Sequence, residues 1–217
     1  MKRIRPTMLC LFMLCSFLQI GFTQKDSTTL KLNQLIETLI AQDNFNGAVL
    51  YAKGEEILYE KYHGLIHPFK EARLNQNSSF NLASISKQFF GAALLLLQEE
   101  GKIAVYAPLQ NSFKDFPHKG VTVRNLVTHT SGLKEYFNEV ILSYSTNHIV
   151  ENEDVYRTMM LQDSLFNFEP GEQFQYSNTN YIFLGILIEQ VAKMPVEQFL
   201  KERIFNKLGL KNTFAYH

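Results

Sequence analysis

Apolar side chains recur at helical spacing in several stretches of the chain. The first such stretch spans 28–42, where leucine and isoleucine return every three or four positions. The most apolar helix is predicted from about Ser84 to Glu100, with Gly101 directly after its end. Further helices are predicted over 121–128, 181–192 and 195–207.

Alternating and β-branched stretches predict strands near the start of the chain. Residues 46–52 and 56–62 read as two strands joined by a short turn, a β-hairpin. The polar stretch 64–79 predicts a loop, and 133–163 predicts loops and short helices because its periodicity is weak. The pattern as a whole predicts an α/β protein, with a hairpin of strands followed by a long helical region.

The first 23 residues have the pattern of a secretory signal peptide. Lys2, Arg3 and Arg5 form a positive start, and a mostly apolar run follows from Met8 to Ile20. Small residues then precede Gln24, and the run is short for a bilayer span. We therefore expect residues 1–23 to be removed and the protein to be exported, either periplasmic or secreted, with no stable membrane span. An uncleaved membrane anchor is the alternative.

Composition excludes several classes of chemistry. Both cysteines, Cys10 and Cys15, lie in the predicted signal peptide, so the mature chain would have neither a thiol nucleophile nor a Cys metal site. The formal net charge is zero and no basic stripe is present, which argues against nucleic-acid binding. The six histidines are scattered and no Gly-rich phosphate loop occurs, so we expect no metal and no cofactor.

A pair of polar residues opens the most apolar helix. Ser84 and Lys87 have the form S-x-x-K, and positions i and i+3 of a helix share one face. A serine becomes a nucleophile when a neighbouring base takes its proton. The alternative is an N-cap serine with a lysine that extends to the surface. A second S-x-x-K, from Ser131 to Lys134, lies in a turn and does not open a predicted helix.

A second motif, of form Y-x-N, directly precedes the helix predicted over 181–192. Tyr176 follows a turn and a short extended piece, and either Ser177 or Asn178 is expected to cap the helix. A tyrosine in such a place would project from a loop. The same form recurs from Tyr136 to Asn138, so the spacing alone does not identify a site.

Five stretches in order resemble the serine β-lactamase and penicillin-binding superfamily, in particular its class C-like branch of β-lactamase-related serine hydrolases. That resemblance implies a β-lactamase/transpeptidase-like fold. Two of the stretches contain the S-x-x-K and Y-x-N motifs, and a third contains the turn HTSGL. The stretches are 45–64, 80–89, 121–133, 168–191 and 207–214.

The resemblance implies an acyl-enzyme mechanism. Ser84 would attack a carbonyl, Lys87 would lie beside it, and Tyr176 would share the proton transfer. Asn178 would hydrogen-bond both substrate and Lys87. Whether Lys87 or Tyr176 is the base stays open, and the two are expected to titrate as a coupled unit. His129 belongs to the HTSGL turn and is interpreted as structural.

The family's third motif, K-T-G or H-x-G on a later strand, has no counterpart after the Y-x-N motif. We therefore expect residues 24–217 to form a C-terminally incomplete hydrolase domain, with an antiparallel sheet that lacks its last strands. The expected substrate is a small molecule or a peptidoglycan-like peptide: a β-lactam, a D-Ala-D-Ala peptide, a D-amino peptide or an ester. The alternatives are a non-catalytic penicillin binder or sensor and an inactive fragment. No oligomeric state is predicted.

Overall fold

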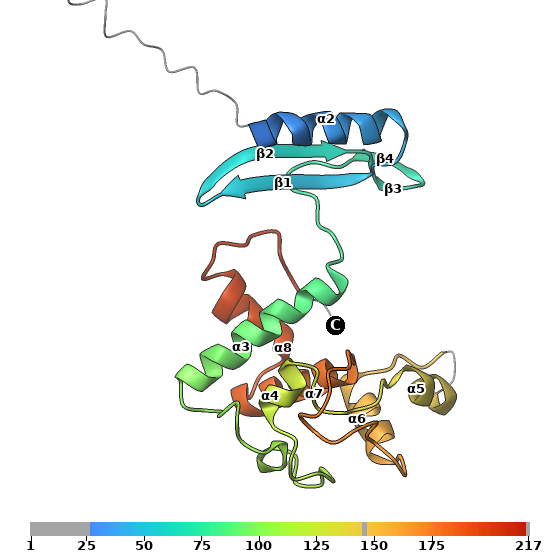
Figure 1. Ribbon diagram of the computed structural model, residues 1–217, viewed down its shortest axis with the longest axis vertical. Coiled ribbons are helices and arrows are strands. Elements are labelled where there is room, and N and C mark those ends of the chain that lie inside the picture. Colours follow the sequence, from blue (N-terminus) through green and yellow to red (C-terminus); the bar gives the residue numbers. More distant parts are fainter. Residues whose placement is uncertain (1–26, 145–146, 216–217) are drawn as a thin grey trace, which may run out of the picture. The chain divides into compact units, whose positions relative to one another are not determined.

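The computed structural model describes residues 27–144 and 147–215 (Figure 1). The chain divides into two compact units, one up to Ser78 and one from Ser79 onward. The predicted signal peptide lies outside the described residues, so its removal and export stay predictions. None of the helices in the described ranges is long and apolar enough to cross a membrane.

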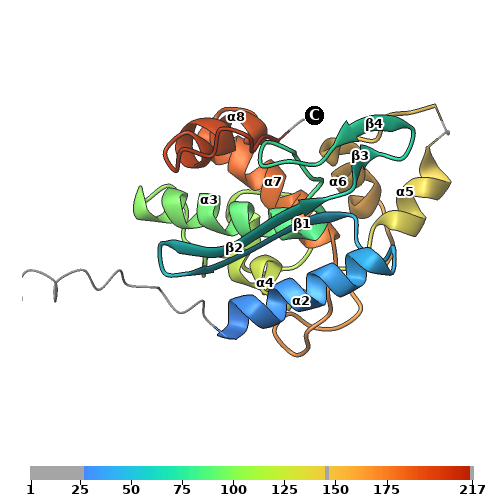
Figure 2. The same ribbon diagram turned by 90° about the horizontal axis from the view of Figure 1, so that it is seen from above.

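The first unit is a helix and two hairpins. Helix α2 (Ser27–Ala41) lies along the antiparallel sheet of β1 (Gly47–Lys53) and β2 (Glu56–His63), as Figures 1 and 2 both show. Lys61 on β2 bonds Glu37 on α2 with 2.7 Å between Nζ and Oε1. The predicted helix and hairpin are confirmed.

The prediction of a loop over 64–79 was wrong in part. A second antiparallel hairpin, β3 (Leu65–His67) and β4 (Lys70–Arg73), occupies this stretch. The side chains of β4 are all exposed, so neither hydrophobic alternation nor burial could reveal the strand. The start of the other strand, β3, is held by Asn46, whose Oδ1 accepts a hydrogen bond from Leu65 N–H at 2.7 Å.

The second unit is helical and is organised around α7. This helix (Thr179–Ala192) contacts α3 (Lys87–Glu99), α4 (Val123–Val127), α6 (Asn152–Met160) and α8 (Val196–Leu200). The remaining elements are α5 (Phe137–Ser143), 3₁₀ turns at Ala83–Ser86 and Leu109–Asn111, and a π-helical turn at Lys201–Phe205.

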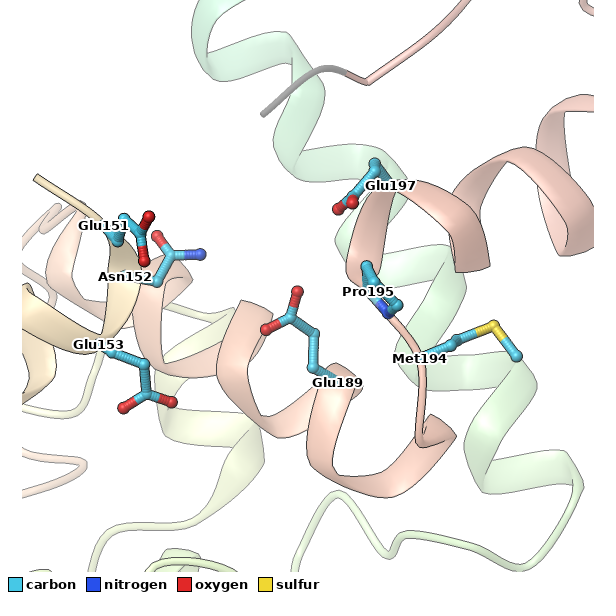
Figure 3. A pocket seen from close by; sticks show the side chains of 7 residues that line it. All are labelled: Glu151, Asn152, Glu153, Glu189, Met194, Pro195 and Glu197. Carbon is cyan, nitrogen blue, oxygen red and sulfur yellow. The ribbon is translucent and has the colours of Figure 1, made fainter. Parts of the chain in front are cut away.

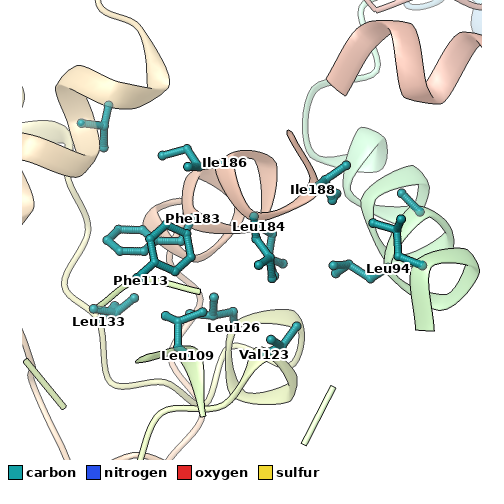
Figure 4. Packing of buried hydrophobic residues seen from close by; sticks show 14 of the residues in the cluster. Leu94, Leu109, Phe113, Val123, Leu126, Leu133, Phe183, Leu184, Ile186 and Ile188 are labelled. Atoms are coloured by element: carbon teal, nitrogen blue, oxygen red, sulfur yellow. The ribbon is translucent and has the colours of Figure 1, made fainter. Parts of the chain in front are cut away.

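Helix α7 is buried on nearly every face, which explains its run of apolar residues. Phe183, Leu184 and Leu187 are fully buried. Phe183 and Leu184 lie in one apolar cluster with Leu94 of α3, Leu126 of α4 and Leu109 (Figure 4). Burial of each such side chain stabilises the fold by about 1.5–3 kcal/mol relative to exposure. The core therefore fixes the N-terminal end of α7, where the Y-x-N motif lies.

The predicted caps and turns of this unit are largely confirmed. Thr122 caps α4 through a capping box with Asn125, and Gly101, with φ of +68°, follows the end of α3. Gly132 in the HTSGL turn has φ of +79°, and a Cβ there would lie 2.0 Å from the Phe168 carbonyl oxygen. Only glycine fits this close approach between two loops.

Candidate active site

The S-x-x-K residues lie where the chain enters α3. Ser84 is in the 3₁₀ turn rather than in the predicted α-helix, and Lys87 is the first residue of α3. Lys87 Nζ donates to Ser84 Oγ at 3.1 Å. Ala83, directly before the serine, has φ of +44°, and Asn81 Oδ1 accepts a hydrogen bond from its N–H at 2.9 Å. A left-handed alanine is strained, so Ser84 is presented by a constrained turn.

The Y-x-N residues meet this pair from the other side. The Tyr176 hydroxyl lies 2.6 Å from Ser84 Oγ, and Lys87 Nζ donates to Asn178 Oδ1 at 2.8 Å. Tyr176 also donates to Asn178 Oδ1 at 3.3 Å. All four residues singled out by the sequence therefore form one hydrogen-bonded cluster, and all belong to the second unit. The half-buried Lys87 amine is hydrogen-bonded to Ser84 and Asn178, which offsets the cost of its burial.

The competing motifs lie elsewhere. Ser131 is 1% exposed, and its hydroxyl donates to Asn180 Oδ1 at 2.5 Å inside the unit. Tyr136 stacks on Phe137 at the start of α5, with 4.7 Å between the ring centroids. Neither residue contacts Ser84 through an observed bond, so geometry separates the two matches of each motif where spacing could not.

The Lys87 ammonium sets the electrostatics of the cluster. It lies 4.9 Å from the ring centroid of Tyr176 and 5.3 Å from that of Tyr181. Hydrogen bonding with Lys87, and then with Ser84, lowers the pKa of Tyr176 below its usual value of 10.0. Burial raises the pKa of Tyr181, which therefore keeps its proton. Tyr176 is the phenol at this site that is biased toward the anion.

Glu135 is a member of the site that the sequence did not indicate. One of its carboxylate oxygens accepts from Asn178 N at 2.7 Å and from Asn178 Nδ2 at 3.3 Å. The carboxylate thereby takes the place of the predicted side-chain cap of α7, which neither Ser177 nor Asn178 supplies. It also orients the Asn178 amide so that Oδ1 faces the Lys87 ammonium.

His129 also contacts the cluster. Its ring is 9% exposed and stacks on Tyr176, with 4.5 Å between centroids and 29° between planes. Ser177 N–H donates to His129 Nδ1 at 3.2 Å. Burial, and then the charge of Lys87, lowers the pKa of the imidazole. The neutral form is therefore the one that packs here.

Ser84 and Tyr176 are both exposed residues. A cavity of about 340 Å³ lies elsewhere, between the start of α6, the end of α7 and α8 (Figure 3). Its lining is acidic, with Glu151, Glu153, Glu189 and Glu197, and the described residues that form it include no serine, threonine, cysteine, histidine or lysine. Within the described ranges, no cluster of three or more His, Cys, Asp or Glu residues is placed to hold a metal ion.

The serine hydroxyl lies in hydrogen-bond contact with a phenol and an amine. An S-x-x-K serine is a signature of β-lactamases and penicillin-binding proteins. The family model described as Beta-lactamase matches residues 32–217, and the chain belongs to that family. The expected β-lactamase/transpeptidase-like fold is confirmed by solved structures.

The proteins similar to this chain include a penicillin-binding protein and a D-amino acid amidase. Penicillin-binding protein 4* of Bacillus subtilis (strain 168) is 36% identical over 186 residues, which are 86% of this chain and 41% of that protein. The D-amino acid amidase of Ochrobactrum anthropi SV3, solved with D-phenylalanine, is 26% identical with a TM-score of 0.69 over 85% of this chain and 52% of its own. FmtA of Staphylococcus aureus, 21% identical with a TM-score of 0.72 over 86% of this chain and 51% of its own, shows the same fold. The chain thus spans about half, or less, of these proteins.

Proposed function

We propose that the protein is a serine hydrolase that acts through an acyl-enzyme on an amide, β-lactam or ester carbonyl. The observation that carries the proposal is the 2.6 Å contact between Ser84 Oγ and the Tyr176 hydroxyl, beside the Lys87 ammonium. This distance suits direct proton transfer from serine to tyrosine. The names of the relatives support a small-molecule or peptidoglycan-like peptide substrate.

Ser84, Tyr176 and Lys87 suggest the following order of steps. The Tyr176 phenolate, stabilised by Lys87, takes the proton of Ser84 as Oγ bonds to the carbonyl carbon, and Tyr176 becomes the neutral phenol. The bond to the leaving amine or alkoxide then breaks, and the leaving group takes that proton. Water attacks the resulting ester, gives a proton back through Tyr176 and Lys87 to Ser84, and releases the acid. Asn178 would orient the substrate and Lys87 together.

Covalent labelling tests the proposal. A fluorescent penicillin and a fluorophosphonate should each label the 217-residue protein, and Ser84→Ala should abolish labelling. Ser131→Ala is the matched control, because it removes the serine of the other S-x-x-K motif, and it should leave labelling intact. Labelling that survives Ser84→Ala would contradict the assignment.

Release of the label separates the hydrolase from the binder. If the acyl group is lost as free acid over time, the protein completes turnover. If it stays attached indefinitely, the protein is a penicillin binder or sensor, and no labelling at all identifies an inactive form. Mass spectrometry of the labelled protein at successive times makes the distinction.

A further inference from the structure

One residue of the HTSGL turn holds the segment 175–177 in three ways. The His129 carbonyl oxygen accepts from Gln175 N–H at 2.9 Å, and His129 Nδ1 accepts from Ser177 N–H at 3.2 Å. Between these two anchors, the imidazole stacks on the Tyr176 ring. The main chain on both sides of Tyr176 and the face of its ring are therefore fixed by the same residue.

His129 is itself placed by rigid structure. It follows α4, whose start is fixed by the Thr122–Asn125 capping box, and its N–H donates to Leu126 O at 3.3 Å. Its φ of +55° is a left-handed conformation that turns the ring back toward the start of α7. The strain of such a backbone is tolerated where surrounding contacts determine it, which is common next to functional groups.

The hydrogen bonds of the ring specify its protonation. Two donors, Ser177 N–H and Asn180 Nδ2, lie 3.2 Å from Nδ1, so this nitrogen is the acceptor and the ring proton is on Nε2. A proton on Nδ1 would confront both donors. The charged and titratable groups near the ring are Lys87, which disfavours a cationic imidazole, Glu135, which favours one, and the phenols of Tyr176 and Tyr181.

We propose that His129 is a positioning residue that holds the Tyr176 hydroxyl on Ser84 Oγ, through a neutral Nε2–H imidazole that stacks on the phenol and anchors the chain on both sides of it. This inference rests on the proposed function, since it gives His129 a role in the same proton transfer. It goes beyond the interpretation of His129 as a residue that only stabilises the turn.

Two substitutions separate the parts of the contact. His129→Asn keeps a residue that tolerates the left-handed backbone but removes the ring. His129→Phe keeps a ring to stack on Tyr176 but removes the Nδ1 acceptor. Because a displacement of about 1 Å can cost about 10²-fold in rate, each variant should acylate about 10- to 100-fold more slowly with penicillin. The control is His118→Gln, which replaces a partly buried histidine that bonds Glu169 and should retain the wild-type rate.

The decisive measurement is the pKa of the Tyr176 phenol, followed by NMR on protein labelled with ¹³C-tyrosine and assigned with Tyr176→Phe. Displacement from Lys87 and Ser84 should raise this pKa toward 10 in both His129 variants and leave it unchanged in His118→Gln. A loss of thermal stability with an unchanged Tyr176 pKa would reduce His129 to a structural residue and overturn the proposal. The titration needs no catalysis, so it stands even where the unsubstituted protein fails to react with penicillin and the proposed function is wrong.

A further measurement needs no substitution. In ¹⁵N NMR of histidine-labelled protein at pH 8, His129 should show an unprotonated Nδ1 and a protonated Nε2. The opposite tautomer would remove the acceptor on which the proposal depends, and would overturn it even if both variants failed to fold.

Discussion

The hydroxyl of Tyr176 lies 2.6 Å from Ser84 Oγ, although 92 positions separate the two residues in the chain. The contact joins the start of α3 to the start of α7, two helices that pack against each other in the core. The core that buries α7 thus also sets the distance between the two oxygens. Changes to either residue should therefore affect acylation more than folding.

Tyr176→Phe and Lys87→Met should each slow acylation of Ser84 by about 10²–10⁴-fold, because each removes part of the proton-transfer unit. The double variant should be little slower than the slower single variant, since the effects of substituting groups that act as one unit are not additive. Pre-steady-state labelling of the four proteins measures this. Tyr136→Phe, in the other Y-x-N match, is the control and should react at the original rate. Losses that multiply in the double variant would show that the two groups act independently.

The rate of acylation should rise with pH and level off below pH 10. The pKa of Tyr176 is lowered, so its anionic form, which accepts the serine proton, becomes populated at lower pH than in a free tyrosine. Lys87→Met removes the largest cause of the lowered Tyr176 pKa, so the pH at which the acylation rate rises should be higher in this variant. Labelling rates measured from pH 6 to 10 test this. If the rate rises at the same pH in Lys87→Met and in the unsubstituted protein, Lys87 does not lower the Tyr176 pKa.

Glu135→Gln should slow acylation by about 10-fold, an order-of-magnitude expectation for a residue that acts through Asn178. A glutamine offers one oxygen and one NH₂, so it no longer imposes a single orientation on the Asn178 amide. The substitution should also lower the pKa of Tyr176 further, since the Glu135 charge raises it. Glu139→Gln, four residues on in α5, is the matched control. A rise of the Tyr176 pKa in Glu135→Gln would contradict the prediction that the Glu135 charge raises this pKa.

The free energy of unfolding should fall as the pH drops below about 6.5, and His129 should account for part of the fall. Its folded pKa is lower than the unfolded value of 6.5, so between these two values the unfolded chain binds more protons. The stabilisation is complete above pH 6.5 and is lost as the pH decreases toward the folded pKa. Urea unfolding at pH 8, 7, 6 and 5 should show a smaller loss of stability in His129→Asn than in the unsubstituted protein. Equal slopes in His129→Asn and the unsubstituted protein would exclude this contribution.

The mature protein should begin near Gln24, because the positive start, the short apolar run and the small residues before this position are typical of a cleaved signal peptide. N-terminal sequencing of the protein from its native host measures this directly. A cytoplasmic species that retains Met1 would contradict export.

The sequence predicted the proximity of Ser84 and Lys87 better than the turn in which Ser84 lies. Ser84 and Lys87 were placed on one face by α-helical spacing, and they do meet, although Ser84 lies in a 3₁₀ turn. The prediction survives because residues i and i+3 of a 3₁₀ helix are eclipsed and so lie closer still. Main-chain geometry that differs between the two helix types leaves no trace in hydrophobic periodicity.

Glu135 and β4 could not be predicted, for a shared physical reason. Glu135 acts on the main-chain N–H of Asn178, 43 positions away, and β4 is held by backbone bonds to β3. Every residue type except proline has a backbone N–H, so such a partner requires no particular side chain at the position that it binds. His129 was noticed only as part of a turn, because its stacking on Tyr176 depends on a left-handed φ that a histidine adopts only occasionally.

The amide of Asn178 uses its oxygen toward Lys87 and Tyr176 and its nitrogen toward Glu135. Its Oδ1 accepts from both Lys87 and Tyr176, and one hydrogen of its amide nitrogen goes to Glu135. An amide oxygen has two lone pairs and an amide nitrogen two hydrogens, so the bonds observed among the described residues use all but one N–H. While Tyr176 keeps its proton, a ligand that reaches Asn178 should therefore meet a donor, which favours a ligand with a carbonyl or carboxylate oxygen at this point over one with an N–H or O–H. Loss of the Tyr176 proton frees one lone pair of Oδ1, so the polarity that Asn178 offers should depend on the protonation of its neighbour.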